Sequence, residues 1–178
     1  MEEKKQQTES KPRKAFKLPE TITEEELVKI LKSTRKPHHK IAYALGFYEC
    51  MRISEIVNLR KEDVDMDRKL LHIKQGKGHK DRHIPIAPEV VGGLRNIPIG
   101  IGVRALQIAF KSKANKVLKK DLHFHLLRHS GITHYLSKKK WNTSLVQQLA
   151  GHSRISTTQI YTHINPSHLV EQMWGEIK

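Results

Sequence analysis

Four polar residues have types and spacings suited to phosphate chemistry. His125 and Arg128 lie three residues apart in the stretch HLLRHS, so a helix would present both side chains on one face. Arg52 and Lys77 supply two further cations earlier in the chain. A basic residue considered alone is most often a solvated surface side chain. Taken together, their order and spacing favour a site that binds phosphate groups.

The stretch GHSRISTTQIY, residues 151–161, adds a tyrosine. Gly151 and His152 are expected to close one helix, and the Ser/Thr run after them is expected to open another. Tyr161 stands nine residues after His152. A tyrosine hydroxyl has a reference pKa of about 10 and needs help to lose its proton before it attacks. Tyr161 is therefore either an ordinary half-buried aromatic residue or a nucleophile.

Metal chemistry is disfavoured by the residues around the possible ligands. Asp63, Asp65 and Asp67 alternate as in a calcium loop, but Arg68 and Lys74 occupy the positions where that loop needs Gly and Glu. His125 and His129 have metal-ligand spacing, but Leu126 and Leu127 follow His125 where a zinc protease would have its Glu. The sequence predicts no metal site and no cofactor.

Composition points to a polyanionic partner. The chain has 178 residues, typical of one domain, and a net charge of +15. Such an excess favours nucleic acid, although an anionic membrane surface or a highly solvated protein surface would also fit the total. Cys50 is the single cysteine, and the polar opening MEEKKQQTES has no signal-peptide character. We expect a cytoplasmic, nucleoid-associated protein without a membrane anchor.

The elements that must position these residues are mostly helical. Thr23 and Glu26 form a capping box before the first helix, Pro37 separates it from the next, and Ser54 is expected to cap a short third helix. Runs at 70–75 and 82–87 predict two strands joined by a hairpin, with 64–67 as a third strand. The remaining expected features are a short helix from Pro88, a glycine-rich loop at 92–100, helices at 103–119 and 125–137, a helix capped by Asn142 or Thr143, and a last helix at about 166–176. This pattern predicts a mainly α fold with a small antiparallel three-stranded β-sheet.

Four boxes in this sequence resemble those of the tyrosine recombinase, or phage integrase, family. MRISEIVNL (51–59) resembles the box around the family's first catalytic arginine, and GKGHKDRHIPI (76–86) resembles its lysine-bearing hairpin. HLLRHS (125–130) is similar to its histidine–x–x–arginine box, and LAGHSRISTTQIYTH (149–163) is similar to its closing histidine-to-tyrosine box. The boxes occur in the family's order, and the Xer-type and archaeal members are the most similar in appearance. The resemblance implies the catalytic-domain fold over residues 20–178. The polar composition of residues 1–19 predicts a disordered tail or linker. Here the sequence departs from the family's pattern, since we expect no N-terminal core-binding domain of the kind that family members usually carry.

The resemblance also implies a role for each site residue. Tyr161 would be the nucleophile, and His125 would take its proton. Arg52 and Arg128 would hold the phosphate oxygens with support from His152, and Lys77 would protonate the departing 5′ oxygen. The products would be a covalent 3′-phosphotyrosyl link and a free 5′ hydroxyl, formed without metal or ATP.

The expected partners are double-stranded DNA at a specific recombination site and further copies of the chain. A tetramer would form on DNA, and the free protein could be a monomer. Candidate DNA contacts are basic side chains beside or beyond these boxes: Lys80, Arg82, Lys111, Lys113, Lys138 and Lys139. The last helix would dock either on a neighbouring subunit or on its own domain. Two alternatives stay open, a DNA-relaxing enzyme of the same covalent type and a non-catalytic DNA-binding protein.

Overall fold

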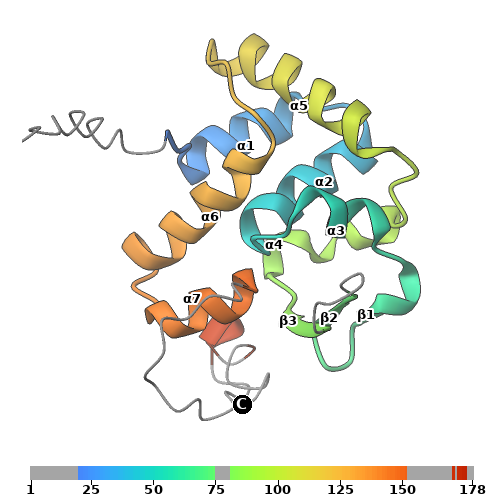
Figure 1. Ribbon diagram of the computed structural model, residues 1–178, viewed down its shortest axis with the longest axis vertical. Helices are drawn as coiled ribbons and strands as arrows, with labels where there is room; N and C mark the ends of the chain where they lie inside the picture. Colours follow the sequence, from blue (N-terminus) through green and yellow to red (C-terminus); the bar gives the residue numbers. More distant parts are fainter. Residues whose placement is uncertain (1–19, 75–80, 152–169, 171, 176–178) are drawn as a thin grey trace, which may run out of the picture.

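The computed structural model describes residues 20–74, 81–151, 170 and 172–175. Helix α2 (Pro37–Tyr48) is at the centre of the helical part, and its last eight residues are all buried. Helices α1 (Glu24–Ser33), α5 (Val103–Leu118) and α6 (His125–Ser137) pack around it (Figure 1). The run IAYALGFY explains this central place, because a helix that is apolar on all sides is stable only when it is surrounded.

Local sequence determines how the first two helices begin. The hydroxyl of Thr23 accepts from the backbone N–H of Glu26, and the Glu26 carboxylate accepts from the Thr23 N–H at 3.1 Å, so the predicted capping box is confirmed. Pro37 was expected to separate two helices, and it does so as the first residue of α2. Proline suits this position because the first helical N–H has no intrahelical partner.

Helix α6 binds the end of α2 through several of the carbonyl groups that a helix terminus leaves unpaired. The Tyr135 hydroxyl donates to the Tyr48 carbonyl at 2.8 Å, and the Arg128 guanidinium donates to the Cys50 carbonyl. Gly131 is in close contact with the Phe47 carbonyl, so a Cβ at this position would lie only 1.9 Å from that oxygen. The two helices can therefore approach this closely only with glycine at position 131.

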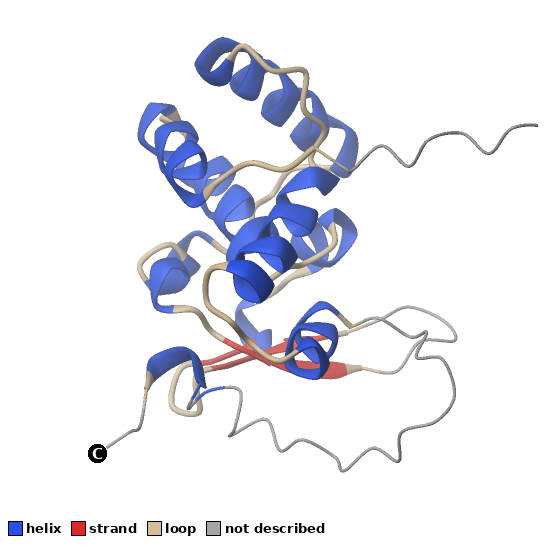
Figure 2. Ribbon diagram, turned by 90° about the vertical axis from the view of Figure 1, so that its left-hand side faces the viewer, coloured by secondary structure: helices blue, strands red, loops and turns tan. Residues whose placement is uncertain are grey.

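A small antiparallel sheet lies at one end of the helices (Figure 2). Its strands are β1 (Val64–Asp65), β2 (Leu70–Ile73) and β3 (Arg82–Pro85), in that order. Leu71 pairs with Ile84, and both are fully buried, so one face of the sheet joins the core. The predicted three-stranded antiparallel sheet is confirmed, while the hairpin turn at 75–80 lies outside the described residues.

The short helices and turns pack against α2, α5, α6 and the sheet. They are α3 (Ile53–Asn58), α4 (Pro88–Val91), α7 (Thr143–Ala150) and the 3-10 turns η1 (Lys61–Asp63) and η2 (Leu94–Asn96). Asn142, rather than Thr143, caps α7, and its side chain accepts from the N–H of Ser144 at 2.8 Å. Gly151 ends α7 with a φ of 67°, as the sequence predicted for a glycine at that terminus.

Two expectations differ from the structure. Helix α3 begins at Ile53, one residue before the expected cap Ser54, because the Glu55 carboxylate accepts from the Arg52 N–H and so takes the capping role. The glycine-rich loop at 92–100 is more ordered than expected, since it contains η2 and buries Leu94, Ile97 and Ile99. In the part of the chain that the structure describes, no helix is long and apolar enough to cross a membrane.

The described part of the C-terminal segment packs on its own chain. Val170 is buried, and the Trp174 indole donates to the Ile86 carbonyl at 2.7 Å. The Lys69 ammonium lies 3.9 Å from the centre of the Trp174 ring. Of the two docking modes left open by the sequence, this structure shows the one within the chain, beside strand β3.

Candidate active site

Arg52 is held at the start of α3 by its own helix. Its backbone N–H and its Nη1 donate to the two oxygens of Glu55, at 2.8 and 2.9 Å. Its Nη2 donates to the Gly151 carbonyl at 3.2 Å, which links α3 to the end of α7. The side chain is 37% exposed, so the guanidinium is fixed in position and still accessible to a substrate.

Arg128 reaches the same stretch of backbone from the first turn of α6. It is buried, and its Nη1 donates to the Cys50 carbonyl, two residues before Arg52. Cys50 has a φ of 49°, the left-handed conformation that non-glycine residues rarely adopt. Burial and then the charge of Arg52 lower the pKa of Arg128 to about 10, so it stays protonated at neutral pH. The two guanidinium groups therefore converge on residues 50–55.

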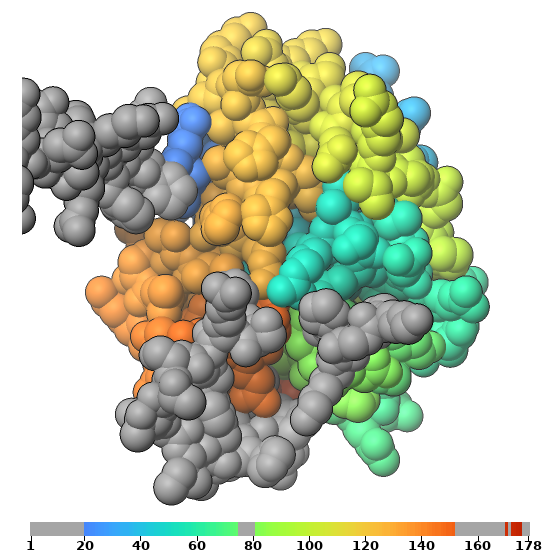
Figure 3. All heavy atoms as spheres, in the orientation of Figure 1, coloured from blue at the N-terminus to red at the C-terminus, as the bar shows by residue number. Residues whose placement is uncertain are grey.

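His125 begins α6 one turn before Arg128. Burial, followed by the charges of His129 and Arg128, lowers its pKa below the ordinary value of 6.5. Its ring stands nearly perpendicular to that of His129, with the centroids 4.7 Å apart. The start of α6 and the region of α3 adjoin on the face shown in Figure 3. A neutral imidazole beside two fixed cations can accept a proton from a group bound there.

Sequence reasoning missed Glu55, which is the acid at the centre of this cluster. Its carboxylate is 7% exposed and binds Arg52 and Arg82. Burial by itself would raise the pKa of Glu55, but the hydrogen bonds and charge of Arg82, together with Arg52, outweigh burial and lower it. The available signal was the spacing of Arg52 and Glu55, because residues three apart on a helix are neighbours.

Arg82 was expected to contact DNA from the protein surface, but its side chain is largely buried. Its side chain is 12% exposed, and both terminal nitrogens donate to Glu55, at 2.9 and 3.1 Å. A Cβ added to Gly151 would lie 2.7 Å from the Nε of Arg82. Arg82 therefore faces the interior of the cluster.

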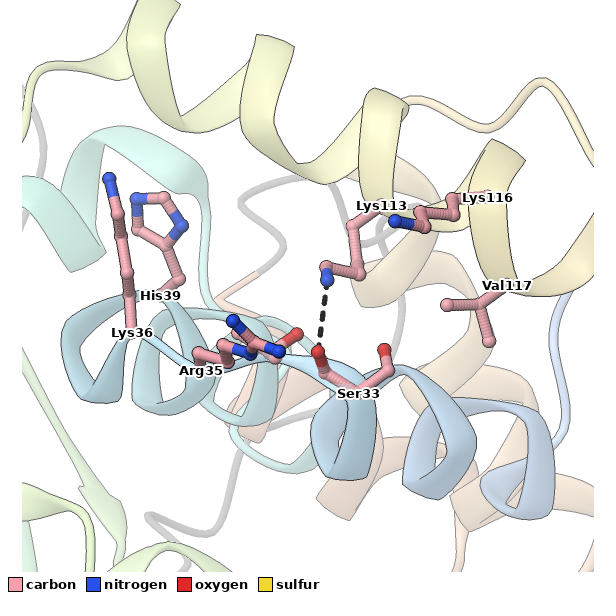
Figure 4. Close-up of a pocket in the computed structure, with 8 residues that line it drawn as sticks. Ser33, Arg35, Lys36, His39, Lys113, Lys116 and Val117 are labelled. Atoms are coloured by element: carbon pink, nitrogen blue, oxygen red, sulfur yellow. Dashed lines mark hydrogen bonds between the residues drawn. The ribbon is translucent and has the colours of Figure 1, made fainter.

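The other candidate DNA contacts lie on separate elements. Lys111 pairs with Asp121 at 3.0 Å, and Lys138 and Lys139 are exposed where α6 ends. Lys113 donates to the Ser33 carbonyl at 3.0 Å and lines a pocket of about 620 Å³ between α5 and the junction of α1 and α2 (Figure 4). Three further cations line this pocket, and within the described residues none of them forms an ion pair with a carboxylate: Arg35, Lys36 and Lys116.

Four of the predicted site residues lie outside the described residues: Lys77, Lys80, His152 and Tyr161. Their neighbours in sequence are placed, since Lys74 follows β2, Asp81 precedes β3, and Gly151 ends α7. Arg52, His125 and Arg128 are thus the described part of the expected catalytic site. No group of three or more His, Cys, Asp or Glu in this described part could hold a metal ion.

Comparison with known proteins gives consistent results. The sequence model of the phage integrase family matches residues 20–98 and 101–168. A tyrosine recombinase of Thermosipho africanus is 34% identical over 174 residues, which cover 86% of this chain and 60% of that protein. The crystal structure of XerA recombinase superposes with a TM-score of 0.70 at 26% identity, over 87% of this chain and 64% of that one.

A lambda integrase dimer bound to a COC′ core site shares the fold, with a TM-score of 0.59 at 17% identity. The match covers 82% of this chain and 62% of that one. The chain thus spans less than two thirds of the length of each of these three proteins.

Proposed function

The chain belongs to the phage integrase family, and from that premise we propose that it is the catalytic domain of a tyrosine site-specific recombinase. It would cleave and rejoin DNA strands through a covalent 3′-phosphotyrosyl intermediate. The observation that carries the proposal is the convergence of Arg52 and Arg128 on residues 50–55, with His125 one turn away on α6. This is the arrangement needed to hold a phosphate beside a proton acceptor.

The two arginines would stabilise the charge that develops during phosphoryl transfer. Such reactions depend mainly on positioning and on cations near the non-bridging oxygens. Guanidinium groups suit this task because they are planar, always charged and able to donate two parallel hydrogen bonds. Among the described residues, the Arg128 guanidinium donates one hydrogen bond, through Nη1, and this leaves further donors for a substrate oxygen.

Proton transfers would accompany the bond changes. The Tyr161 oxygen attacks the scissile phosphorus, its proton passes to His125, and the bond from phosphorus to the 5′ oxygen breaks. Lys77 gives a proton to that departing oxygen, and His152 supports the phosphoryl oxygens. A later attack by a 5′ hydroxyl reverses the sequence and releases the tyrosine, so neither ATP nor a metal ion is consumed. The lowered pKa of His125 supports its part, since it favours the neutral form at physiological pH.

Double-stranded DNA and further copies of the chain are the proposed partners. The net charge of +15 supports a polyanionic ligand. The lambda integrase neighbour is a dimer bound to its core site, which supports self-association on DNA. We extend this to a tetramer at a specific recombination site within a cytoplasmic nucleoid.

Covalent capture tests the proposed function. The protein is incubated with a nicked suicide duplex, in which the cleaved end diffuses away, and adducts are separated under denaturing conditions. We expect a covalent protein–DNA product from the unmodified chain and none from Tyr161→Phe. Tyr43→Phe is the matched control, because the Tyr43 hydroxyl is buried and has no hydrogen-bond partner among the described residues.

Binding of the same duplex is measured in parallel by gel shift. A chain that binds the duplex and forms no adduct contradicts the proposed chemistry. Exchange of strands between two duplexes supports a recombinase, whereas relaxation of supercoils without exchange contradicts this part of the proposal.

A further inference from the structure

Arg82 opens strand β3, two residues after the segment 75–80 that contains Lys77, and pairs with Ile73 on β2. Its guanidinium forms a two-pronged pair with Glu55, with Nη1 on Oε1 at 2.9 Å and Nη2 on Oε2 at 3.1 Å. Both terminal nitrogens are therefore occupied inside the protein. This geometry is that of a fixed fork-to-carboxylate pair rather than of a mobile surface cation.

Arg52, Glu55 and Arg82 form a unit that we call the arginine clasp. Each oxygen of Glu55 accepts two hydrogen bonds, one from Arg52 and one from Arg82. The carboxylate is almost completely buried, so its charge is not dispersed into solvent. One negative and two positive charges leave a net positive charge in the clasp, and the Arg52 side is the part open to solvent.

The clasp also contacts the end of α7. Arg52 donates to the Gly151 carbonyl, and Gly151 lies so close to Arg82 that a Cβ would fall 2.7 Å from its Nε. That Nε is buried without a hydrogen-bond partner among the described residues. Arg82 thus lies between α3 and the residue that precedes His152 in the sequence.

We propose that Arg82 is a positioning residue for DNA strand cleavage and does not itself contact DNA. It holds Glu55 in the orientation that aims Arg52 at the scissile phosphate, and it supports the backbone from which His152 continues. The proposal rests on the proposed function, because cleavage is the reaction that the clasp would serve. Lysine at position 82 would keep the charge but lose the two-pronged contact, so Glu55 and Arg52 would no longer be fixed.

The test separates binding from chemistry with Arg82→Lys. Single-turnover adduct formation is measured at saturating DNA, and the Kd is measured by fluorescence anisotropy at several salt concentrations. We expect cleavage to slow about 100-fold while the Kd and its salt dependence stay within twofold, since a positioning residue acts on the chemical step. Arg82→Ala, which removes the charge that lysine keeps, is measured for binding in parallel: a raised Kd with a salt slope smaller by about 0.9 in this variant would show that Arg82 contacts a phosphate, and would overturn the proposal.

Arg68→Lys is the matched control in the turn between β1 and β2, because the Arg68 side chain is 80% exposed and lies outside the clasp. It should leave both cleavage and binding unchanged.

A double-mutant cycle tests whether Arg82 and Glu55 act as one unit. It compares Arg82→Lys, Glu55→Gln and the variant that carries both changes. We expect the double variant to cleave no more slowly than the slower single variant, since both changes break the same unit. Multiplicative losses would mean that the two residues act independently, which contradicts the clasp.

A readout independent of activity distinguishes failure of this proposal from failure of the proposed function. Arginine side-chain NMR reports how slowly the Arg52 guanidinium rotates and exchanges its protons. We expect slow exchange for Arg52 in the unmodified chain and at least tenfold faster exchange in Arg82→Lys, with the circular dichroism unchanged. Unchanged exchange in the variant would refute the clasp even if the chain cleaves DNA. Faster exchange in a chain that forms no adduct would support the clasp and contradict the recombinase chemistry.

Discussion

Arg52 and Arg128 carry the same charge in unequal surroundings. Arg52 is partly exposed and bonded to Glu55 and Gly151, whereas Arg128 is buried and bonded to the Cys50 carbonyl. Bringing two cations together costs free energy, and burial of Arg128 adds to that cost. Glu55 offsets part of the cost, and an anion bound between the arginines would offset more. The site therefore favours a ligand with negatively charged oxygens.

At the same scale, the environment of His125 predicts how cleavage depends on pH. Because its pKa lies below 6.5, His125 is neutral above that pKa and becomes protonated below it. A proton acceptor works only in the neutral form, so single-turnover cleavage should fall on acidification with a midpoint below pH 6.5. The profile of adduct formation between about pH 5 and pH 8 measures this midpoint.

His129→Gln provides the directional check. The charge of His129 helps to lower the pKa of His125, so its removal should shift the midpoint upward toward 6.5 and leave the plateau rate unchanged. His83→Gln removes an exposed histidine on β3 and should leave the midpoint in place. A midpoint above pH 6.5, or a midpoint that His129→Gln does not move, would show that another group controls the fall of the cleavage rate at low pH.

At the scale of elements, local signals in the sequence predicted the helices well and the interior of the site poorly. The capping box at Thr23 and the apolar spacing of 125–137 are local, and α1 and α6 begin and end close to the expected residues. The inward turn of Arg82 depends on Glu55, which is 27 residues away in the sequence, so no local pattern reveals it. The roles of Lys77, His152 and Tyr161 remain predictions, because these residues lie outside the described part.

The contact between α2 and α6 predicts a large effect of one methyl group. In Gly131→Ala the new Cβ would lie 1.9 Å from the Phe47 carbonyl oxygen, so the helices must separate. Such overpacking should lower the free energy of unfolding by about 3 kcal/mol. It should also slow cleavage, because α6 carries His125 and Arg128. Urea denaturation followed by circular dichroism measures the loss of stability.

Gly92→Ala is the matched control for this change. Position 92 has open space around its Cβ direction and a φ of −64°, which alanine adopts without strain. We expect its free energy of unfolding to change by less than about 1 kcal/mol. Equal effects of the two substitutions would mean that the close approach of α6 to α2 does not limit stability.

At the scale of the whole molecule, positive charge is distributed well beyond the candidate active site. The net charge of +15 includes the cations around the pocket between α1, α2 and α5, and the exposed lysines at the end of α6. If DNA is the partner, these side chains are candidates for contacts with its phosphates. Binding should therefore depend strongly on phosphate contacts, in addition to any contacts that recognise the proposed recombination site.

Salt dependence tests this distribution of charge. If the chain neutralises about five phosphates, log K should fall with log salt with a slope of about −4.5, which is roughly a 500-fold loss of affinity between 50 and 200 mM salt.

Lys138 and Lys139 are exposed at the end of α6, so replacing both by Ala should reduce the slope by about 1.8 if each contacts one phosphate. Lys111→Ala should have a smaller effect, because that ammonium already pairs with Asp121 at 3.0 Å. Anisotropy titrations with specific and random duplexes should give the same change in slope, since phosphates carry no sequence information. A slope near zero for the unmodified chain would contradict electrostatic binding, and an unchanged slope in the double variant would place the end of α6 away from the DNA.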